Sequence, residues 1–405
     1  MANVSSSNGL EKYPKLRFKG FSDPWETDTL GNLGTFMKGA PLSKADITDE
    51  GTPFVLYGEL YTTYGEVTHS IKRRTDKVVE PQFYSKVGDV IMPTSGETPE
   101  DIATASCIML PDVILAGDLL IYRTQKVDGR LVSFVVKNKV NKQISSVAQG
   151  KSVVHVRAEE LSKISISYPS DAEQQKILAM LELLEDKITK QRELIEHLKK
   201  YKRGVYKSIF AASRLDCAWV SLGELCEIIT KGTTPHSFLS DGTIRYIKIE
   251  SIVDGHIANE NCKFIDQETH EGALSRSILK EGDILFSIAG SLGVCVIVQQ
   301  SNLPANTNQA LAIIRLKETE NRNYILSVLR SSLMEEYILA SRTTGAQPNL
   351  SLQQMRDFRL PYPNADEQQK IALFADRMEK RFNLEQGKLE KLLAMKSALL
   401  QQLFI

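Results

Sequence analysis

Two closely matching stretches decide the fold of this chain: YPSDAEQQKI at residues 168–177 and YPNADEQQKI at residues 362–371. They lie 194 residues apart, and the correspondence continues without a gap to Phe210 and Phe404. This period is much longer than the roughly 20 to 50 residues of a solenoid repeat. The chain therefore contains two copies of one module, each with a globular part followed by a helix.

The duplication extends upstream into the globular parts. The anchors there keep almost the same spacing, so only small gaps separate the two copies. The matched anchors are Trp25 with Trp219, Gly88-Asp89 with Gly282-Asp283, and, at a spacing of 192, Leu30-Gly31 with Leu222-Gly223.

Each helical part carries apolar residues spaced alternately by four and three, which is the heptad pattern of a coiled-coil seam. Polar residues interrupt the two seams at matching places, and such residues can fix the register of a coiled coil. The first seam is Ile177, Leu181, Leu184, Ile188, Gln191, Ile195, Leu198, Lys202, Val205 and Ile209; the second is Ile371, Ala375, Met378, Phe382, Glu385, Leu389, Leu392, Lys396, Leu399 and Leu403.

The two helices are predicted to pair with each other, because their seams are equally long and interrupted at equivalent sites. Helices of this length would be rods on the order of 55 Å long. Antiparallel pairing would bring the C-terminal Phe404 back near Trp25. The alternative is that each helix packs only on its own globular module.

The globular modules are predicted to be mixed α/β, with short strands separated by turn residues. The fold class is therefore α+β, with two pseudo-repeated domains separated by a long antiparallel two-helix coiled coil. A helix is expected over residues 324–340, with 131–138 as its counterpart. The expected strands are 54–57, 89–92, 118–123, 244–249, 283–288 and 311–316.

Composition excludes several classes of protein. The chain has 405 residues, and its 50 basic residues balance its 50 acidic ones, so the global charge gives no support to nucleic-acid binding. Five scattered cysteines without a CxxC pair argue against a disulfide framework or a cysteine-rich zinc site. No apolar run approaches the roughly 20 residues needed to cross a bilayer, and the N-terminus lacks a signal-peptide pattern. We expect a cytoplasmic protein.

From about Leu16 to Ile405 the chain resembles the specificity subunits of type I restriction–modification systems. Besides the two helix openings, the stretches that carry the resemblance are LRFKGFSDPWE, YGELYTTYGEV, KGTTPH, IRYIKIESI and TTGAQPNLS. The resemblance implies two target recognition domains, each reading one half of a bipartite DNA target. It also implies that the helical rod sets the spacer between the halves.

The resemblance further implies a set of partners: double-stranded DNA, two methyltransferase subunits and a nuclease–translocase subunit, without a membrane. The chain itself would be non-catalytic and would hold no cofactor, with S-adenosylmethionine bound by the methyltransferase. Two other readings stay open. The chain could be a stand-alone DNA-binding regulator, or a coiled-coil scaffold without a DNA role.

The predicted domain order is a flexible tail at 1–13, recognition domain 1 at 14–165, spacer helix 1 at 166–212, recognition domain 2 at 213–360 and spacer helix 2 at 361–405. Candidate DNA contacts are basic, amide and hydroxyl side chains that suit phosphates or base edges. They are Tyr57, Tyr61, Tyr64, Lys72, Arg73, Arg74 and Ser95 in the first module, and Arg245, Lys248, Ser291, Asn308, Gln309 and Gln347 in the second. A solvated charge run beside core tyrosines is the alternative for the first set. Structural roles in loops are the alternative for Asn308 and Gln347.

Overall fold

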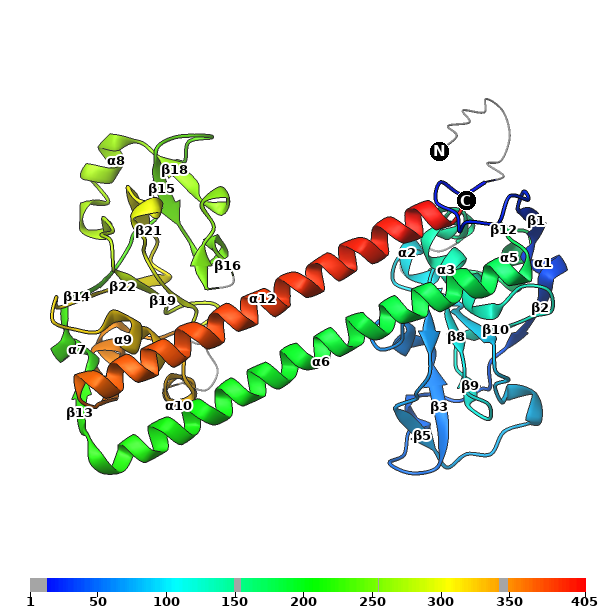
Figure 1. The fold of residues 1–405 in the computed structure, drawn as a ribbon, viewed down its shortest axis with the longest axis horizontal. Coiled ribbons are helices and arrows are strands. Elements are labelled where there is room, and N and C mark those ends of the chain that lie inside the picture. The colour runs from blue at the N-terminus through cyan, green and yellow to red at the C-terminus, as the bar shows by residue number, and fades with distance from the viewer. Residues whose placement is uncertain (1–12, 149–153, 254, 342–348) are drawn as a thin grey trace. The chain divides into compact units, whose positions relative to one another are not determined.

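The computed structural model describes residues 13–148, 154–253, 255–341 and 349–405. These residues form two compact units: unit 1 contains Met1–Lys190 and Glu390–Ile405, and unit 2 contains Gln191–Leu389. Each unit thus combines one globular module with a segment of both long helices, α6 (Asp171–Asp216) and α12 (Ala365–Leu403) (Figure 1).

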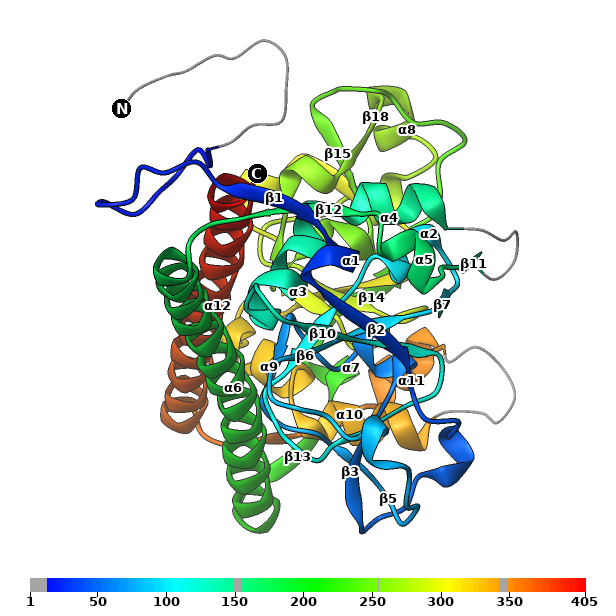
Figure 2. The ribbon, with the colours of Figure 1, turned by 90° about the vertical axis from the view of Figure 1, so that its right-hand side faces the viewer.

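Unit 1 contains a five-stranded sheet in the order β2-β10-β6-β8-β4 and a three-stranded sheet in the order β5-β3-β9. Helix α3 packs against β6 and β8 of the larger sheet, and Figure 2 shows α3 next to β6. The elements are β1 (Glu26–Thr29), α1 (Leu30–Leu33), β2 (Gly34–Lys38), β3 (Thr52–Leu56), β4 (Val67–Thr68), β5 (Arg73–Thr75), β6 (Asp89–Pro93), β7 (Ser95–Gly96), α2 (Pro99–Ile102), β8 (Ser106–Ile108), β9 (Ile114–Ala116), β10 (Leu119–Thr124), α3 (Gly129–Asn138), α4 (Asn141–Val147), β11 (Val154–His155), α5 (Ala158–Leu161) and β12 (Ser165–Tyr168).

Unit 2 repeats this topology with a four-stranded sheet, β14-β22-β19-β20, and a three-stranded sheet, β18-β15-β21. Each three-stranded sheet pairs its central strand parallel to one neighbour and antiparallel to the other. The elements are β13 (Ala218–Ser221), α7 (Leu222–Leu225), β14 (Cys226–Lys231), β15 (Ile244–Ile247), β16 (Ile252–Val253), β17 (His256–Ile257), β18 (Lys263–Ile265), α8 (Gln267–Glu271), β19 (Ile284–Ser287), β20 (Cys295–Ile297), β21 (Ala305–Thr307), β22 (Leu311–Leu316), α9 (Arg322–Leu329), α10 (Ser332–Ala340), α11 (Leu352–Asp357) and β23 (Arg359–Tyr362).

The duplicated Gly-Asp anchors form the same turn in both units. Gly88 has φ +94° and Gly282 has φ +86°, a backbone conformation that favours glycine. The aspartate that follows each glycine is buried at the start of a strand of the larger sheet. It forms an ion pair with an arginine on the neighbouring strand. Asp89 pairs with Arg123 at 3.1 Å, and Asp283 pairs with Arg315 at 2.7 Å. The turn therefore fixes both the strand start and the carboxylate that orients the arginine.

The repeated EQQ pattern also has a structural cause. The side-chain amide of Gln174 donates to the carbonyl oxygen of Pro169 at 3.0 Å, and that of Gln368 donates to Pro363 at 2.9 Å. Both glutamines are almost fully buried. Each therefore satisfies a buried carbonyl at the turn that leads into its long helix.

In each unit a segment of α6 lies beside an antiparallel segment of α12. In unit 1 Lys396 of α12 contacts Glu185 of α6, and in unit 2 Lys202 of α6 contacts Glu379 of α12 at 2.6 Å. These two pairs occupy equivalent positions of the duplication. Every predicted seam residue, including the polar ones, is buried or half-buried. The antiparallel pairing predicted from the heptads is confirmed.

The polar positions Gln191 and Glu385, which are equivalent in the duplication, contact each other. The amide of Gln191 donates to a carboxylate oxygen of Glu385 at 2.8 Å and to its backbone carbonyl at 2.9 Å. Arg381 and Lys388 also reach this carboxylate, at 2.8 and 3.1 Å. Hydrogen bonding to Gln191, together with these cations, lowers the pKa of Glu385. The one glutamate in the seam is therefore held in its charged form.

The C-terminal end of α12 closes the core of unit 1. Leu400, Leu403 and Phe404 share a cluster of buried residues with Trp25, and the Phe404 and Trp25 rings meet edge to face at 6.4 Å between centroids. The predicted return of Phe404 to Trp25 is thus confirmed. It follows from the helix pairing, because antiparallel packing carries the last turn of α12 back to the first module.

Most predicted elements are present, with two differences. The helix expected over 324–340 is two helices, α9 and α10, because Ser331 caps the second one: its hydroxyl accepts from the amide of Leu333 at 3.3 Å. The first long helix, expected to end by residue 212, continues to Asp216, and β13 begins two residues later. The linker between the first helix and the second module is therefore almost absent.

Candidate nucleic-acid interface

The first group of candidate residues in unit 1 lies where β3 and β6 end. The 3-10 helix Tyr57–Leu60 follows β3, and the rings of Tyr57 and Tyr61 meet edge to face at 6.4 Å. The Tyr61 hydroxyl donates to the carbonyl oxygen of Ser95, 2.7 Å away; Ser95 begins β7, two residues after the end of β6. Burial raises the pKa of this hydroxyl, so it stays protonated. The sequence candidates Tyr57, Tyr61 and Ser95 thus form one cluster.

The basic run predicted to contact DNA lies on and beside β5. Lys72 is exposed, while Arg73 forms an ion pair with Glu59 at 2.9 Å and Arg74 donates to the carbonyl oxygen of Gly51 at 2.8 Å. All three cations are exposed, and partners of this kind leave the outer edge of a guanidinium accessible. The run is therefore a surface feature that both DNA phosphates and base edges can reach.

Two of the candidates in unit 1 use their hydroxyls inside the protein. Tyr64 is buried and accepts from the backbone amide of Lys72 at 3.2 Å. Ser95 is buried and donates to a carboxylate oxygen of Asp118 at 3.2 Å. In this structure both side chains position the surrounding segments; for Tyr64 this is the placement that the alternative of core tyrosines describes.

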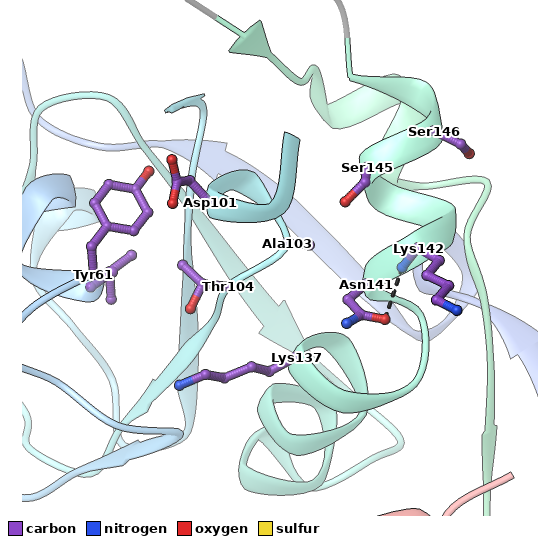
Figure 3. A pocket seen from close by; sticks show the side chains of 10 residues that line it. Tyr61, Asp101, Ala103, Thr104, Lys137, Asn141, Lys142, Ser145 and Ser146 are labelled. Carbon is purple, nitrogen blue, oxygen red and sulfur yellow. Dashed lines mark hydrogen bonds between the residues drawn. The ribbon is translucent and has the colours of Figure 1, made fainter. Parts of the chain in front are cut away.

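A hollow of about 680 Å³ adjoins Tyr61 (Figure 3). Tyr61 and Asp101 face it from one side, and Asn141 and Ser145 of α4 face it from the other. Lys137 enters the lining 3.5 Å from Glu66. The further lining residues are Leu60, Ala103, Thr104, Lys142 and Ser146. Sequence reasoning missed this site because its residues come from three segments that only the fold brings together.

In unit 2 the candidate residues gather around the loop that follows β21. Gln309 accepts a hydrogen bond from the Thr234 hydroxyl at 2.7 Å, and the backbone amide of Gly232 donates to the Asn308 carbonyl at 3.1 Å. A Cβ on Gly232 would lie 1.7 Å from the carbonyl oxygen of Thr307. The KGTTPH segment therefore needs this glycine to approach the loop.

The same surface contains Arg276, which sequence reasoning also missed. Its guanidinium donates to the Thr233 hydroxyl at 3.1 Å and is exposed. The residue lies in a short 3-10 helix, Ser275–Ser277, outside every motif of the sequence. Arg276 and Thr233 lie 43 residues apart in the sequence, and no sequence pattern indicated that they meet.

The remaining candidates of unit 2 occupy strand ends. Arg245 lies in β15 and donates to the Leu303 carbonyl at 3.4 Å, while Lys248, directly after β15, lies 5.3 Å from the centre of the Phe238 ring. Ser291 is exposed in the turn after β19. Asn308 accepts from the amide of Ala310 at 3.1 Å, which is the structural role kept as an alternative. Gln347 lies outside the described residues.

The family model for the "Type I restriction modification DNA specificity domain" matches this chain twice, at residues 22–200 and 216–394. The chain belongs to this family. The two matches divide the specificity subunit as the internal duplication does, with each match covering one globular module and most of the helix after it. The resemblance that the sequence motifs carried is therefore confirmed.

Individual relatives agree with this assignment. The specificity subunit is 20% identical over 384 residues to the type I restriction enzyme MjaVIII specificity subunit of Methanocaldococcus jannaschii, covering 89% of this chain and 88% of that one. It is 26% identical over 159 residues to the EcoBI specificity subunit of Escherichia coli, covering 37% and 32%. Its fold matches the crystal structure of an S subunit from M. genitalium, with a TM-score of 0.62, 17% identity and coverage of 97% and 99%.

Among the described residues of the specificity subunit, no helix is both long enough and apolar enough to cross a membrane.

Proposed function

We propose that the specificity subunit reads a bipartite sequence on double-stranded DNA, with one half of the target read by each globular module. The observation that carries this proposal is the equivalent placement of candidates of different chemistry. Tyr57 and Tyr61 follow β3 in unit 1, and Lys248 follows the equivalent strand β15 in unit 2. Two related scaffolds that present different side chains at the same strand ends are suited to reading two different half-sites.

The role proposed for α6 and α12 is to set the spacer between the half-sites and to dock two methyltransferase subunits. In unit 2 both helices carry large apolar side chains on their exposed faces: Leu194 and Tyr201 on α6, and Leu373 and Leu384 on α12. The spacings of seven and eleven residues place each pair on one face of its helix. Exposed apolar stripes of this kind suit a helical partner surface.

The subunit is proposed to supply recognition and no chemistry of its own. Methylation of adenine would use S-adenosylmethionine held by the methyltransferase subunits, and a nuclease–translocase subunit would complete the restriction complex. This work would take place in the cytoplasm, on the host genome. Near-neutral charge is compatible with such a role, because the docked subunits add contacts of their own with the phosphate backbone.

The test is to co-express the chain with a candidate methyltransferase subunit and map the modified adenines across the host genome. The expected result is one split motif that appears only when this chain is present. A stable complex that adds no methylation would contradict the proposal and favour a scaffold. Specific, salt-dependent DNA binding by the chain alone would favour a stand-alone regulator.

Variants in single units sharpen this test. Arg74→Ala in unit 1 and Gln309→Ala in unit 2 should each relax one half of the motif, because a lost base contact costs roughly 1–3 kcal/mol of discrimination. Lys163→Ala is the matched control, since this exposed lysine pairs with Glu160, three residues away, and lies outside both clusters. Relaxation of both halves by one variant would show that the modules do not read independently.

A further inference from the structure

The first turns of α6 are covered in unit 1 by the segment that precedes β1. The backbone amide of Leu16 donates to the carbonyl oxygen of Gln402, 3.0 Å away. The Arg17 guanidinium makes two hydrogen bonds of 2.8 Å to the two carboxylate oxygens of Glu173. The ammonium group of Lys176 lies 5.0 Å from the centre of the Phe21 ring. Glu173 and Lys176 thus anchor an arginine and an aromatic residue four positions apart.

This cover buries the glutamate. Glu173 is 1% exposed, and Arg17 is the cation that compensates its charge in the fold. A bidentate arginine–carboxylate pair is among the stronger polar contacts available to a protein. The segment Leu16–Phe21 therefore acts as an intramolecular ligand for the start of a long helix.

In unit 2 the residues equivalent to Glu173 and Lys176 are present, but no described segment like Leu16–Phe21 covers them. Glu367 and Lys370 stand in the first turns of α12, at the positions equivalent to Glu173 and Lys176. The chain enters β13 directly from the end of α6, so no segment like Leu16–Phe21 precedes it. The residues that would correspond to that segment are the last turns of α6 itself.

A groove of about 820 Å³ remains at this place. Its apolar lining includes Ile371 and Phe374, and its polar lining includes Glu367 and Lys370. Glu367 is exposed, and no described residue forms an ion pair or hydrogen bond with its carboxylate. The equivalent carboxylate in unit 1 is buried beneath an arginine. The glutamate of this motif is therefore paired with an arginine in unit 1, whereas in unit 2 no described residue pairs with it.

We propose that the groove at the start of α12 binds a segment of a partner protein that presents an arginine and, four positions after the arginine, an aromatic residue. The arginine forms a bidentate pair with Glu367, and the aromatic ring packs beneath Lys370. Charge complementarity and the occupied copy in unit 1 identify this chemistry. The proposal is independent of DNA recognition, because none of the residues that line the groove is a candidate DNA contact.

The probe is the chain's own ligand sequence, a fluorescent peptide PKLRFKGF corresponding to residues 14–21, titrated into the full-length protein. We expect saturable binding of one peptide per chain. Glu367→Gln should weaken binding by about tenfold to a hundredfold, because a charge-assisted hydrogen-bond pair is lost. Arg17→Ala within the peptide should weaken it by a similar factor, with the protein unchanged.

Asp366→Asn is the matched control, because it removes an adjacent exposed acid from the same helical turn. It should leave the affinity for the peptide within about twofold, as expected of a screened surface charge. Equal losses in the Asp366 and Glu367 variants would overturn the proposal in favour of nonspecific attraction. Absence of saturable binding up to millimolar peptide would also overturn it.

The location is tested with a photo-crosslinking group in place of the peptide's aromatic residue at position 21. Crosslinks are expected on residues 361–374. Crosslinks on residues 169–180 would show that the peptide displaces the natural segment in unit 1, and the groove of unit 2 would then not be the site.

Discussion

Lys396→Met tests whether buried ion pairs at the end of α12 stabilise unit 1. The ammonium group of Lys396 lies 2.9 Å from Glu66 and also contacts Glu185, while Lys137 lies 3.5 Å from Glu66. Burial by itself would raise the pKa of Glu66, but the two lysines hold this pKa below its usual range. Methionine keeps the length of the side chain and removes its charge.

The expected loss follows from the burial of Glu66. Removing one partner of a buried pair costs roughly 3–5 kcal/mol because the other charge is left uncompensated. Lys137 remains near Glu66, so we expect the free energy of unfolding of unit 1 to fall by about 2–3 kcal/mol. The pseudo-symmetric Lys202→Met in unit 2 is the control. Lys202 and Glu379 are each about a quarter exposed, and such a pair contributes about 1 kcal/mol or less.

Native-state hydrogen exchange measures the two units separately. In Lys396→Met, amides of β6 and β10 should exchange faster while those of β19 and β22 keep their protection. Adding Glu66→Gln should recover part of the loss, because the amide leaves no buried charge. Equal effects of the Lys396 and Lys202 variants, or no effect of the former, would refute the argument from burial.

Three further predictions use the same measurement. Gly232→Ala should destabilise its loop by more than about 2 kcal/mol, because the new methyl group meets the Thr307 backbone. The same substitution should weaken DNA binding. Unchanged hydrogen exchange of the backbone amides in this loop would contradict the prediction. Glu385→Leu and Gln191→Leu should show a coupling of roughly 1 kcal/mol in a double-mutant cycle, whereas additive effects would mean that their hydrogen bond contributes nothing to stability. The folded pKa of Glu66 lies below its ordinary value of 4.5, so its stabilising contribution is complete above that pH and is lost as the pH falls through the lowered pKa. Unit 1 should therefore lose protection in acid, and Glu66→Gln should flatten this dependence.

The sequence by itself determined the duplication, the fold class and the pairing of the long helices. Heptad spacing specifies which face of each helix is buried, and matching polar interruptions specify a register, so Gln191 and Glu385 could be expected in the seam. The return of Phe404 to Trp25 followed from antiparallel pairing alone. These features are local or periodic, and periodicity can be read along a chain.

Only the tertiary structure decided how the surfaces are built. The hollow beside Tyr61 joins residues from three segments, and Arg276 meets the Thr233 loop across 43 positions. Identical motifs also lie in different environments: Glu173 is buried beneath Arg17, whereas Glu367 is exposed. The physical reason is that burial and pairing of a side chain depend on which distant segment covers it, and the two copies of the module differ in that segment.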